Sequence, residues 1–149
     1  MFHNILLMAP VTAWLIAQIL KTVIYVSFNK RFVAERLVGG GGMPSSHSAT
    51  VCALSTITFL KFGVNSFEFA MAAIFALVTM YDAMGVRSET VRQGEVINDM
   101  VELFKNMGND IGPDKALKEL IGHTPLQVAV GAILGILVSV IMYNMEYFF

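Results

Sequence analysis

The chain has few charged residues and almost no cysteine, and both scarcities limit what kind of protein it can be. Of its 149 residues only 14% are charged, whereas 56% are hydrophobic, which lies well outside the composition of a soluble domain. The composition therefore predicts a protein whose solvent is a lipid bilayer. The single cysteine, Cys52, excludes a disulfide or a cysteine metal cluster within one chain. A formal net charge of −1 gives no indication of nucleic-acid binding.

The length of the chain fits one domain, residues 1–149. It contains four apolar segments that are candidates for membrane helices. The segments cover about residues 5–28, 46–62, 67–84 and 126–149. The first and last are long enough to span a bilayer, whereas the middle two are short and joined by a small turn, which predicts a helical hairpin. We therefore predict an all-α integral membrane bundle of about four transmembrane or membrane-embedded helices. Apolar residues at helical spacing within 85–122 add an amphipathic helix, on the membrane surface or against the bundle.

The last apolar segment contains two glycines four residues apart, Gly131 and Gly135. This small-xxx-small pattern permits two helix backbones to approach closely. The close contact can lie within the bundle or between subunits. The pattern is therefore compatible with a homo-oligomer that associates through these glycines.

The most informative motif is Gly39–Ser48, in which four glycines precede Met-Pro-Ser-Ser-His-Ser. Glycine lets the backbone approach a ligand closely, and Ser45 or Ser46 can cap the next helix, whose free N–H groups then point at the turn. The motif predicts a site for a tetrahedral anion that includes Gly42, with His47 beside it as a proton donor. The alternative is a loop that ends in an ordinary serine cap, which leaves the histidine without a role.

A second histidine precedes another predicted helix start. Thr124 and Gln127 have the spacing of a capping box, with Pro125 at the first helical position. His123 therefore comes immediately before a helix N-terminus, where a neutral imidazole can attack or contact phosphorus and the helix dipole favours the anion. On its own, His123 is better explained as a polar residue at the membrane interface. Because His47 also lies at a predicted helix start, beside the glycine turn, a site shared by the two histidines is favoured.

Three motifs lie in order along the chain at predicted helix ends: residues 41–49, 81–87 and 120–125. Together they resemble the divergent branch of the type-2 phosphatidic acid phosphatase and vanadium haloperoxidase superfamily, and the resemblance covers nearly the whole chain. It implies a membrane-embedded phosphatase-like domain that hydrolyses a phosphate ester without a metal, through a phosphohistidine. It also implies that His123 is the nucleophile, His47 the general acid and Arg87 a phosphate ligand, while the turn serines cradle phosphate oxygens.

The superfamily's first motif supplies basic residues, and two alternatives for it stay open. Lys21, inside the first apolar segment, forms a polar helix face with Gln18. The pair Lys30 and Arg31 follows the same segment, and Lys30 to Arg36 is the nearest candidate to the family's motif by spacing. Lys21 instead matches the position where the divergent branch has a lysine in its first helix. For Lys21 a structural alternative is that its ammonium simply extends to the membrane interface.

The chain departs from the superfamily pattern at Ser46, which replaces the glycine of the histidine motif, in the longer interval between Arg87 and His123, and at position 127. In the third motif an aspartate four residues after the nucleophilic histidine holds its tautomer, and here that position is Gln127, which is better explained by the capping box. Asp82 lies near a predicted helix C-terminus, where the dipole disfavours an anion, so it is expected to have a cationic partner. It can orient a catalytic histidine in place of the missing aspartate, or it can form a plain interfacial ion pair.

The distribution of basic residues predicts the orientation. With four spans, only Lys61 lies on one face, whereas eight lysines and arginines lie on the other, and the positive-inside rule makes that crowded face cytoplasmic. The glycine turn, Arg87 and the second histidine motif share that face. We therefore predict a protein of the cytoplasmic membrane whose site faces the cytoplasm and whose termini both lie outside.

These observations favour a phosphatase acting on a lipid or polyprenyl phosphate or diphosphate, with a phosphorylated lipid or small phosphate and the membrane as its partners. Neither a metal nor a cofactor is implied, because His47 and His123 lack carboxylate or cysteine ligands at a recognisable spacing. The alternative function is a non-catalytic membrane protein that binds or transports phosphorylated lipid. A third class is a structural subunit whose histidines only cap helices.

Overall fold

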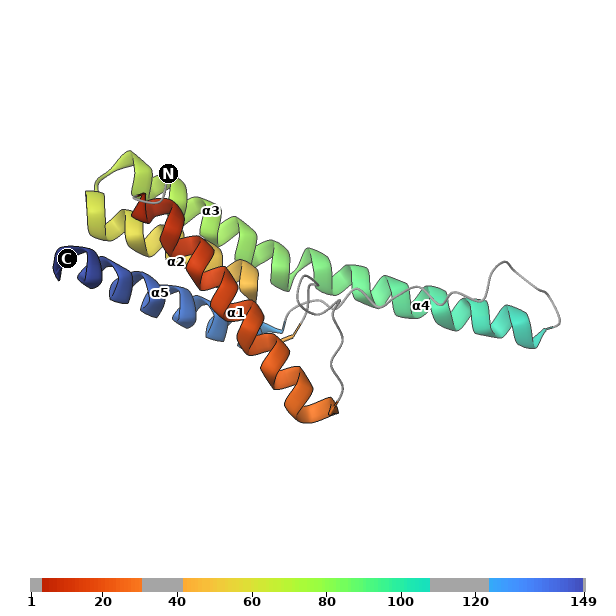
Figure 1. Ribbon diagram of the computed structural model, residues 1–149. Coiled ribbons are helices and arrows are strands. Elements are labelled where there is room, and N and C mark those ends of the chain that lie inside the picture. The colour runs from red at the N-terminus through yellow and green to blue at the C-terminus, as the bar shows by residue number, and fades with distance from the viewer. Residues whose placement is uncertain (1–3, 31–41, 108–123, 149) are drawn as a thin grey trace.

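A computed structural model describes residues 4–30, 42–107 and 124–148 of the protein, and all the regular structure within them is α-helical (Figure 1). The four bundle helices are α1, α2, α3 and α5, and α4 continues α3 away from the bundle (Figure 1). The prediction of an all-α membrane bundle is confirmed. The bounds are Ile5–Asn29 for α1, Ser46–Phe62 for α2, Phe67–Met84 for α3, Val86–Asn106 for α4 and Pro125–Phe148 for α5.

Helix α2 differs from the other three bundle helices because protein rather than lipid surrounds it. Among the described residues, three helices are long and apolar enough to cross a membrane, and they are α1, α3 and α5. Helix α2 has 17 residues, one fewer than α3, and it carries serine, threonine and histidine residues along its length. It contacts each of the other three bundle helices. Its polar Ser48 and Thr58 are buried against them, which explains why the helix can be less apolar.

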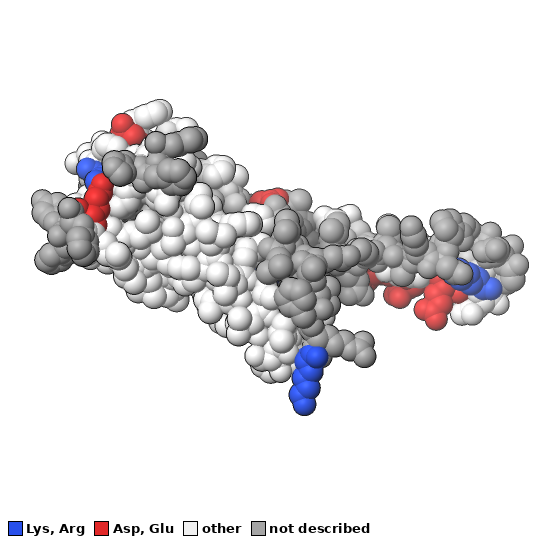
Figure 2. All heavy atoms as spheres, viewed as in Figure 1, with Lys and Arg blue, Asp and Glu red and all other residues white. Residues whose placement is uncertain are grey.

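The bundle core consists mainly of alanines, and the large apolar side chains point outward. Ala13 and Ala17 of α1 are fully buried against Ala49 and Ala53 of α2. Small side chains let these helices approach closely, which is how helices associate where lipid supplies no hydrophobic driving force between them. The visible bundle surface is almost free of charged side chains, which gather at its two ends and on α4 (Figure 2).

The contact between α2 and α5 depends on two glycines. A Cβ atom at Gly131 would overlap the carbonyl oxygen of Ser45, and one at Gly135 would overlap that of Ala49. Farther along the same contact, Ser139 Oγ donates a hydrogen bond to the Ala53 carbonyl at 2.8 Å. The glycine pattern therefore operates within the bundle, the first of its two alternatives. Association of copies through it stays a prediction.

The two ends of the bundle differ in character. The turn between α2 and α3, which contains Gly63 at φ +82° and the cap Ser66, lies at the same end as the C-terminus of α5 (Figure 1). This turn confirms the predicted helical hairpin, and Lys61 pairs with Glu146 at this end. The opposite end gathers the N-termini of α2 and α5 and the start of α4 (Figure 1). The candidate site lies there.

The predicted amphipathic helix in 85–122 corresponds to α4, and residues 108–122 lie outside the described residues. Among the described elements, α4 contacts α3 alone. Of the two alternatives, packing against the bundle is limited in Val86–Asn106 to this contact with α3, and a position on the membrane surface stays a prediction. Gly85 joins α3 and α4 in a nearly helical conformation, at φ −95° and ψ −77°, so α4 keeps the direction of α3.

Candidate functional site

The N-terminus of α2 is capped by Ser45 and not by Ser46. The Ser45 Oγ accepts hydrogen bonds from the Ser48 N–H at 3.4 Å and from the Ser48 Oγ at 3.1 Å. Both Ser45 and Ser48 are fully buried. Because the cap uses Ser45, the hydroxyl of Ser46 at the first helical position is left available for other contacts.

The turn before α2 packs directly on the side chain of Lys21. Gly42 adopts φ +87°, a left-handed conformation that favours glycine. A Cβ atom at this position would also lie 3.1 Å from Lys21 Cγ, tighter than an ordinary contact. Conformation and space therefore both require glycine here, and the turn covers the aliphatic part of the lysine.

Lys21 itself is buried inside the bundle. Only 3% of the residue is exposed, and Nζ donates a hydrogen bond to Ser46 Oγ at 3.3 Å. Its ammonium therefore does not extend to the membrane interface, which was the structural alternative. A buried ammonium inside a membrane protein is costly and in most cases functional.

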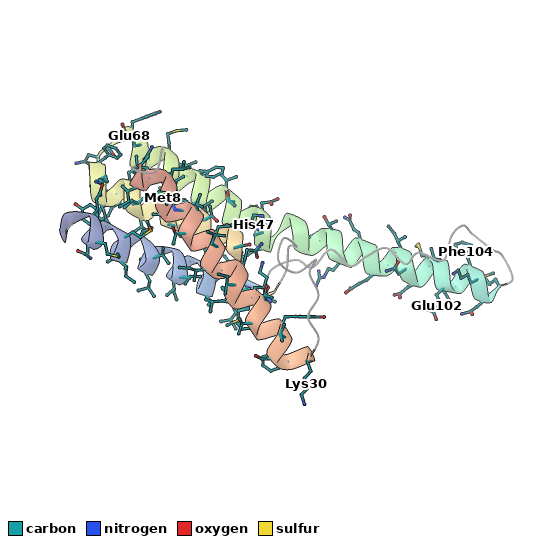
Figure 3. All side chains as sticks on the ribbon, viewed as in Figure 1. Met8, Lys30, His47, Glu68, Glu102 and Phe104 are labelled. Carbon is teal, nitrogen blue, oxygen red and sulfur yellow. The ribbon has the colours of Figure 1, made fainter. Side chains whose placement is uncertain are left out.

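Of the two alternatives for the basic first motif, the geometry favours Lys21. Lys30 caps the end of α1 with φ 51°, and its exposed side chain points away from the bundle (Figure 3). The structure therefore does not bring Lys30 to the turn. Its predicted companion Arg31 lies outside the described residues.

The N-terminus of α5 meets the N-terminus of α2. The Ser45 N–H donates to the Gln127 carbonyl at 3.1 Å, which joins the two helix starts directly. The predicted capping box is present: Thr124 N–H donates to Gln127 Oε1 at 3.2 Å, and Gln127 N–H donates to Thr124 Oγ1 at 3.4 Å. The Gln127 side chain is therefore engaged in the cap. His123 lies outside the described residues, and in the sequence it directly precedes Thr124, the first residue of the capping box.

The other predicted site residues come from α2, α3 and α4 at the same end of the molecule. His47 is in the first turn of α2 and lies at the end of the bundle from which α4 leaves (Figure 3). Asp82 is in the last turn of α3 and is partly buried. Arg87 is the second residue of α4, although its side chain is outside what the structure describes. The backbone therefore brings the motifs 41–49 and 81–87 to one end of the bundle, where the start of α5 also lies.

Gln18 was named from the sequence only as a neighbour of Lys21, but the structure gives it a more prominent place. It is 5% exposed, and its Oε1 is buried without a hydrogen-bond partner among the described residues. A buried acceptor that lacks a partner is costly. The sequence contains one feature that could have identified Gln18 as a site residue, namely a polar side chain within an apolar span.

This arrangement is suited to holding an anion. The N-terminus of α2, with its positive dipole end, lies at the buried Lys21 side chain and the Ser46 hydroxyl, and the start of α5 lies next to it. In the described parts of the chain, no three His, Cys, Asp or Glu side chains gather where they could hold a metal ion. Lys21, Ser46 and the N–H groups at the start of α2 offer electrostatic binding of an anion, and an imidazole such as that of His47 is a group that can transfer a proton.

Comparison with known proteins agrees with this geometry. Residues 2–138 match the family model described as the Divergent PAP2 family. The chain is also 39% identical, over 155 aligned positions, to a protein of Bacillus subtilis (strain 168) named uncharacterized membrane protein YuiD. That alignment covers 98% of this chain and 96% of the relative. No solved structure matches the chain significantly.

Proposed function

The chain belongs to the divergent PAP2 family, and from that membership we propose that it is a membrane phosphatase acting on a lipid or polyprenyl phosphate or diphosphate. The observation that carries this proposal is the buried Lys21 ammonium beside Ser46, under the Gly42 turn and next to two helix N-termini. A fixed cation and oriented N–H groups in a site screened from water stabilise the charge that develops on phosphate oxygens.

The proposed reaction proceeds through two steps. His123 attacks phosphorus and a phosphorus–nitrogen bond forms while the ester P–O bond breaks, and His47 donates its proton to the leaving oxygen. A water molecule then attacks the phosphohistidine, gives a proton to His47, and releases inorganic phosphate. Throughout, Lys21 and the N–H groups at the start of α2 hold the equatorial oxygens, with Arg87 as a further ligand.

Anion binding is the first expected result. Millimolar orthovanadate or phosphate should raise the melting temperature of the purified protein, because a ligand that binds only the folded state adds RT ln(1 + [L]/Kd) to its stability. Lys21→Met should abolish this shift, since the substitution removes the buried cation while keeping an apolar stem of similar length. The measurement compares melting curves with and without anion for each variant against its own baseline.

Lys30→Met is the matched control, because it removes the same charge from the exposed end of the same helix. This variant should keep the shift of the unmodified protein. Loss of the shift in Lys30→Met and its retention in Lys21→Met would transfer the binding site to the end of α1. A wild-type protein without any shift would favour a structural subunit whose histidines only cap helices.

We propose further that the site faces the cytoplasm, as the asymmetry of basic residues indicates. Single cysteines are placed at Gly40, Asp110 and Asn65 in a Cys52→Ala background. In intact cells an impermeant maleimide should label the cysteine at position 65 and spare those at 40 and 110. Labelling at 40 and 110 with protection at 65 would place the site outside the cell.

A further inference from the structure

Gln18 carries a hydrogen-bond acceptor that the described protein does not satisfy. The residue is 5% exposed, and its Oε1 atom is buried without a hydrogen-bond partner among the described residues. Leaving a buried acceptor without a donor costs the desolvation of that group. A leucine of similar volume would fill the same space without this cost. An amide is therefore unfavourable at this position unless another molecule supplies the missing donor.

Gln18 lies beside the candidate site, one helical turn before Lys21 on α1. Residues three apart on a helix are neighbours on its surface, and both of these side chains are buried in the bundle. Long side chains of a helix point back toward its N-terminus, which directs the Lys21 side chain over the turn that carries Gln18. The unsatisfied amide oxygen and the buried ammonium therefore belong to one polar region.

The two donors closest to Gln18 along α1 bond to other atoms. Lys21 Nζ donates to Ser46 Oγ at 3.3 Å, and no hydrogen bond joins it to Gln18 Oε1. Thr22 Oγ1 donates to the main-chain carbonyl of Gln18 at 2.8 Å, so the single proton of this hydroxyl is used by the helix backbone. The amide oxygen thus stays open to a donor that a bound ligand brings.

The chemistry of an acceptor in an anion site restricts which anion fits. The groups assigned to phosphate binding, namely Lys21, Arg87 and the N–H groups at the start of α2, can only donate hydrogen bonds. They bind oxygens that carry no proton. An acceptor beside them favours an oxyanion that also carries an O–H group, because an oxygen without a proton would place its lone pairs against those of the amide. Phosphate carries such a proton near neutral pH, whereas sulfate and phosphodiesters carry none.

We propose that Gln18 is a specificity-determining residue of the anion site, whose amide oxygen accepts a hydrogen bond from the O–H group of a protonated phosphate. The inference rests on the proposed function, since it requires that the site at Lys21 binds the phosphate of the substrate. It adds the substrate class, which is a terminal phosphate in its protonated form, either in a monoester or at the end of a diphosphate. The headgroup phosphodiesters of a bilayer lack this proton, so the same contact excludes them.

Binding of inorganic phosphate and of sulfate to the purified full chain in detergent at neutral pH tests this proposal. Dissociation constants are obtained from the rise in melting temperature with anion concentration, and the rise in the Lys21→Met variant is subtracted as the general effect of each salt. The unmodified protein should bind phosphate about tenfold or more tightly than sulfate, the factor expected for one hydrogen bond to a charged group.

Gln18→Leu should remove this preference. The variant should bind sulfate as well as the unmodified protein does or better, and its affinity for phosphate should fall to the level of sulfate. Because leucine replaces an acceptor that has no partner among the described residues, the melting temperature without anion should not fall.

Thr22→Val is the matched control for this variant. It removes a buried hydroxyl one turn farther along the same helix, and this hydroxyl is bonded to the helix backbone. The control should keep the ratio of phosphate to sulfate affinity of the unmodified protein. Loss of the ratio in Thr22→Val as well would mean that any change of polarity on this face of α1 alters binding, and it would overturn the specific role of Gln18.

Three further results would overturn the proposal. Equal affinity of the unmodified protein for phosphate and sulfate would mean that no acceptor faces the anion. Equal weakening of both anions in Gln18→Leu would mean that the amide donates to the anion. A lower melting temperature of Gln18→Leu with an unchanged ratio would mean that the amide is structural and holds a water molecule. Absence of binding of either anion to the unmodified protein is a different failure, because it would overturn the proposed function and this inference with it.

Discussion

Gly135→Leu is expected to separate α5 from α2 and to lower the free energy of unfolding by about 3 kcal/mol or more. The reason is that a Cβ atom at Gly135 would overlap the backbone carbonyl of Ala49 and lie 2.9 Å from the Ala53 nitrogen. A clash with backbone cannot be relieved by a rotamer change, so one helix must move. Because Gly131 contacts Ser45 in the same way, this movement would also separate the two helix N-termini of the site. Denaturant or thermal unfolding in detergent measures the loss.

Gly94→Leu is the matched control for this prediction. It makes the same chemical change at a helical glycine that has no heavy atom within 4 Å of an added Cβ, and it should leave stability unchanged or slightly improved because leucine favours helix. A Gly135→Leu variant as stable as this control would contradict the α2–α5 packing. A variant that retains its stability but loses a dimer would show that the glycine pattern acts between subunits.

The second large effect is expected at the two histidines, which the proposed reaction assigns to different steps. His123→Ala should reduce turnover by about three orders of magnitude or more and prevent formation of the phosphohistidine, because it removes the nucleophile. His47→Ala should slow the hydrolysis of alkyl phosphates strongly but spare attack on p-nitrophenyl phosphate, whose leaving group needs no proton. Acid-labile phosphorylation of the protein and phosphate release are measured for both substrates.

The double variant checks whether the histidines act together. Residues that work as one unit show strongly non-additive effects, so His47→Ala/His123→Ala should be little worse than His123→Ala alone. Equal losses in the rate of protein phosphorylation by both substrates in His47→Ala would argue against a role as general acid; phosphate release can fall for both, because His47 also accepts the proton of the attacking water. Full phosphorylation of the His123→Ala variant would place the nucleophile elsewhere.

Much of the fold follows from local signals in the sequence. The apolar segments predict the bundle because each signal is contained within one helix, and the box of Thr124 and Gln127 predicts the start of α5 because a capping box closes within four residues. The same engagement of Gln127 explains why this position can lack the aspartate of the wider superfamily. It also leaves the orientation of His123 to another group, for which Asp82 remains the predicted candidate.

The contacts that build the site could be predicted only as alternatives. Lys21 and Lys30 have the same charge, and only the packing of the Gly42 turn on α1 distinguishes them. Likewise, the sequence cannot say whether Gly131 and Gly135 face α2 or another copy, since both contacts require the same small residues. The direction of α4 depends on the conformation at Gly85, and a helical pattern on either side of a glycine does not specify the angle between the two helices.

The central claim is that this site hydrolyses phosphate esters without a metal, and phosphate release in the presence of EDTA tests it most directly. The purified protein in lipid nanodiscs is given a lipid phosphate, a polyprenyl diphosphate and p-nitrophenyl phosphate, with Lys21→Met and Lys30→Met variants in parallel. We expect that EDTA does not reduce phosphate release by the unmodified protein. The Lys21→Met variant should lose this release, and the Lys30→Met variant should retain it. Anion binding without release from any of these substrates would contradict it and would favour a protein that binds or transports phosphorylated lipid.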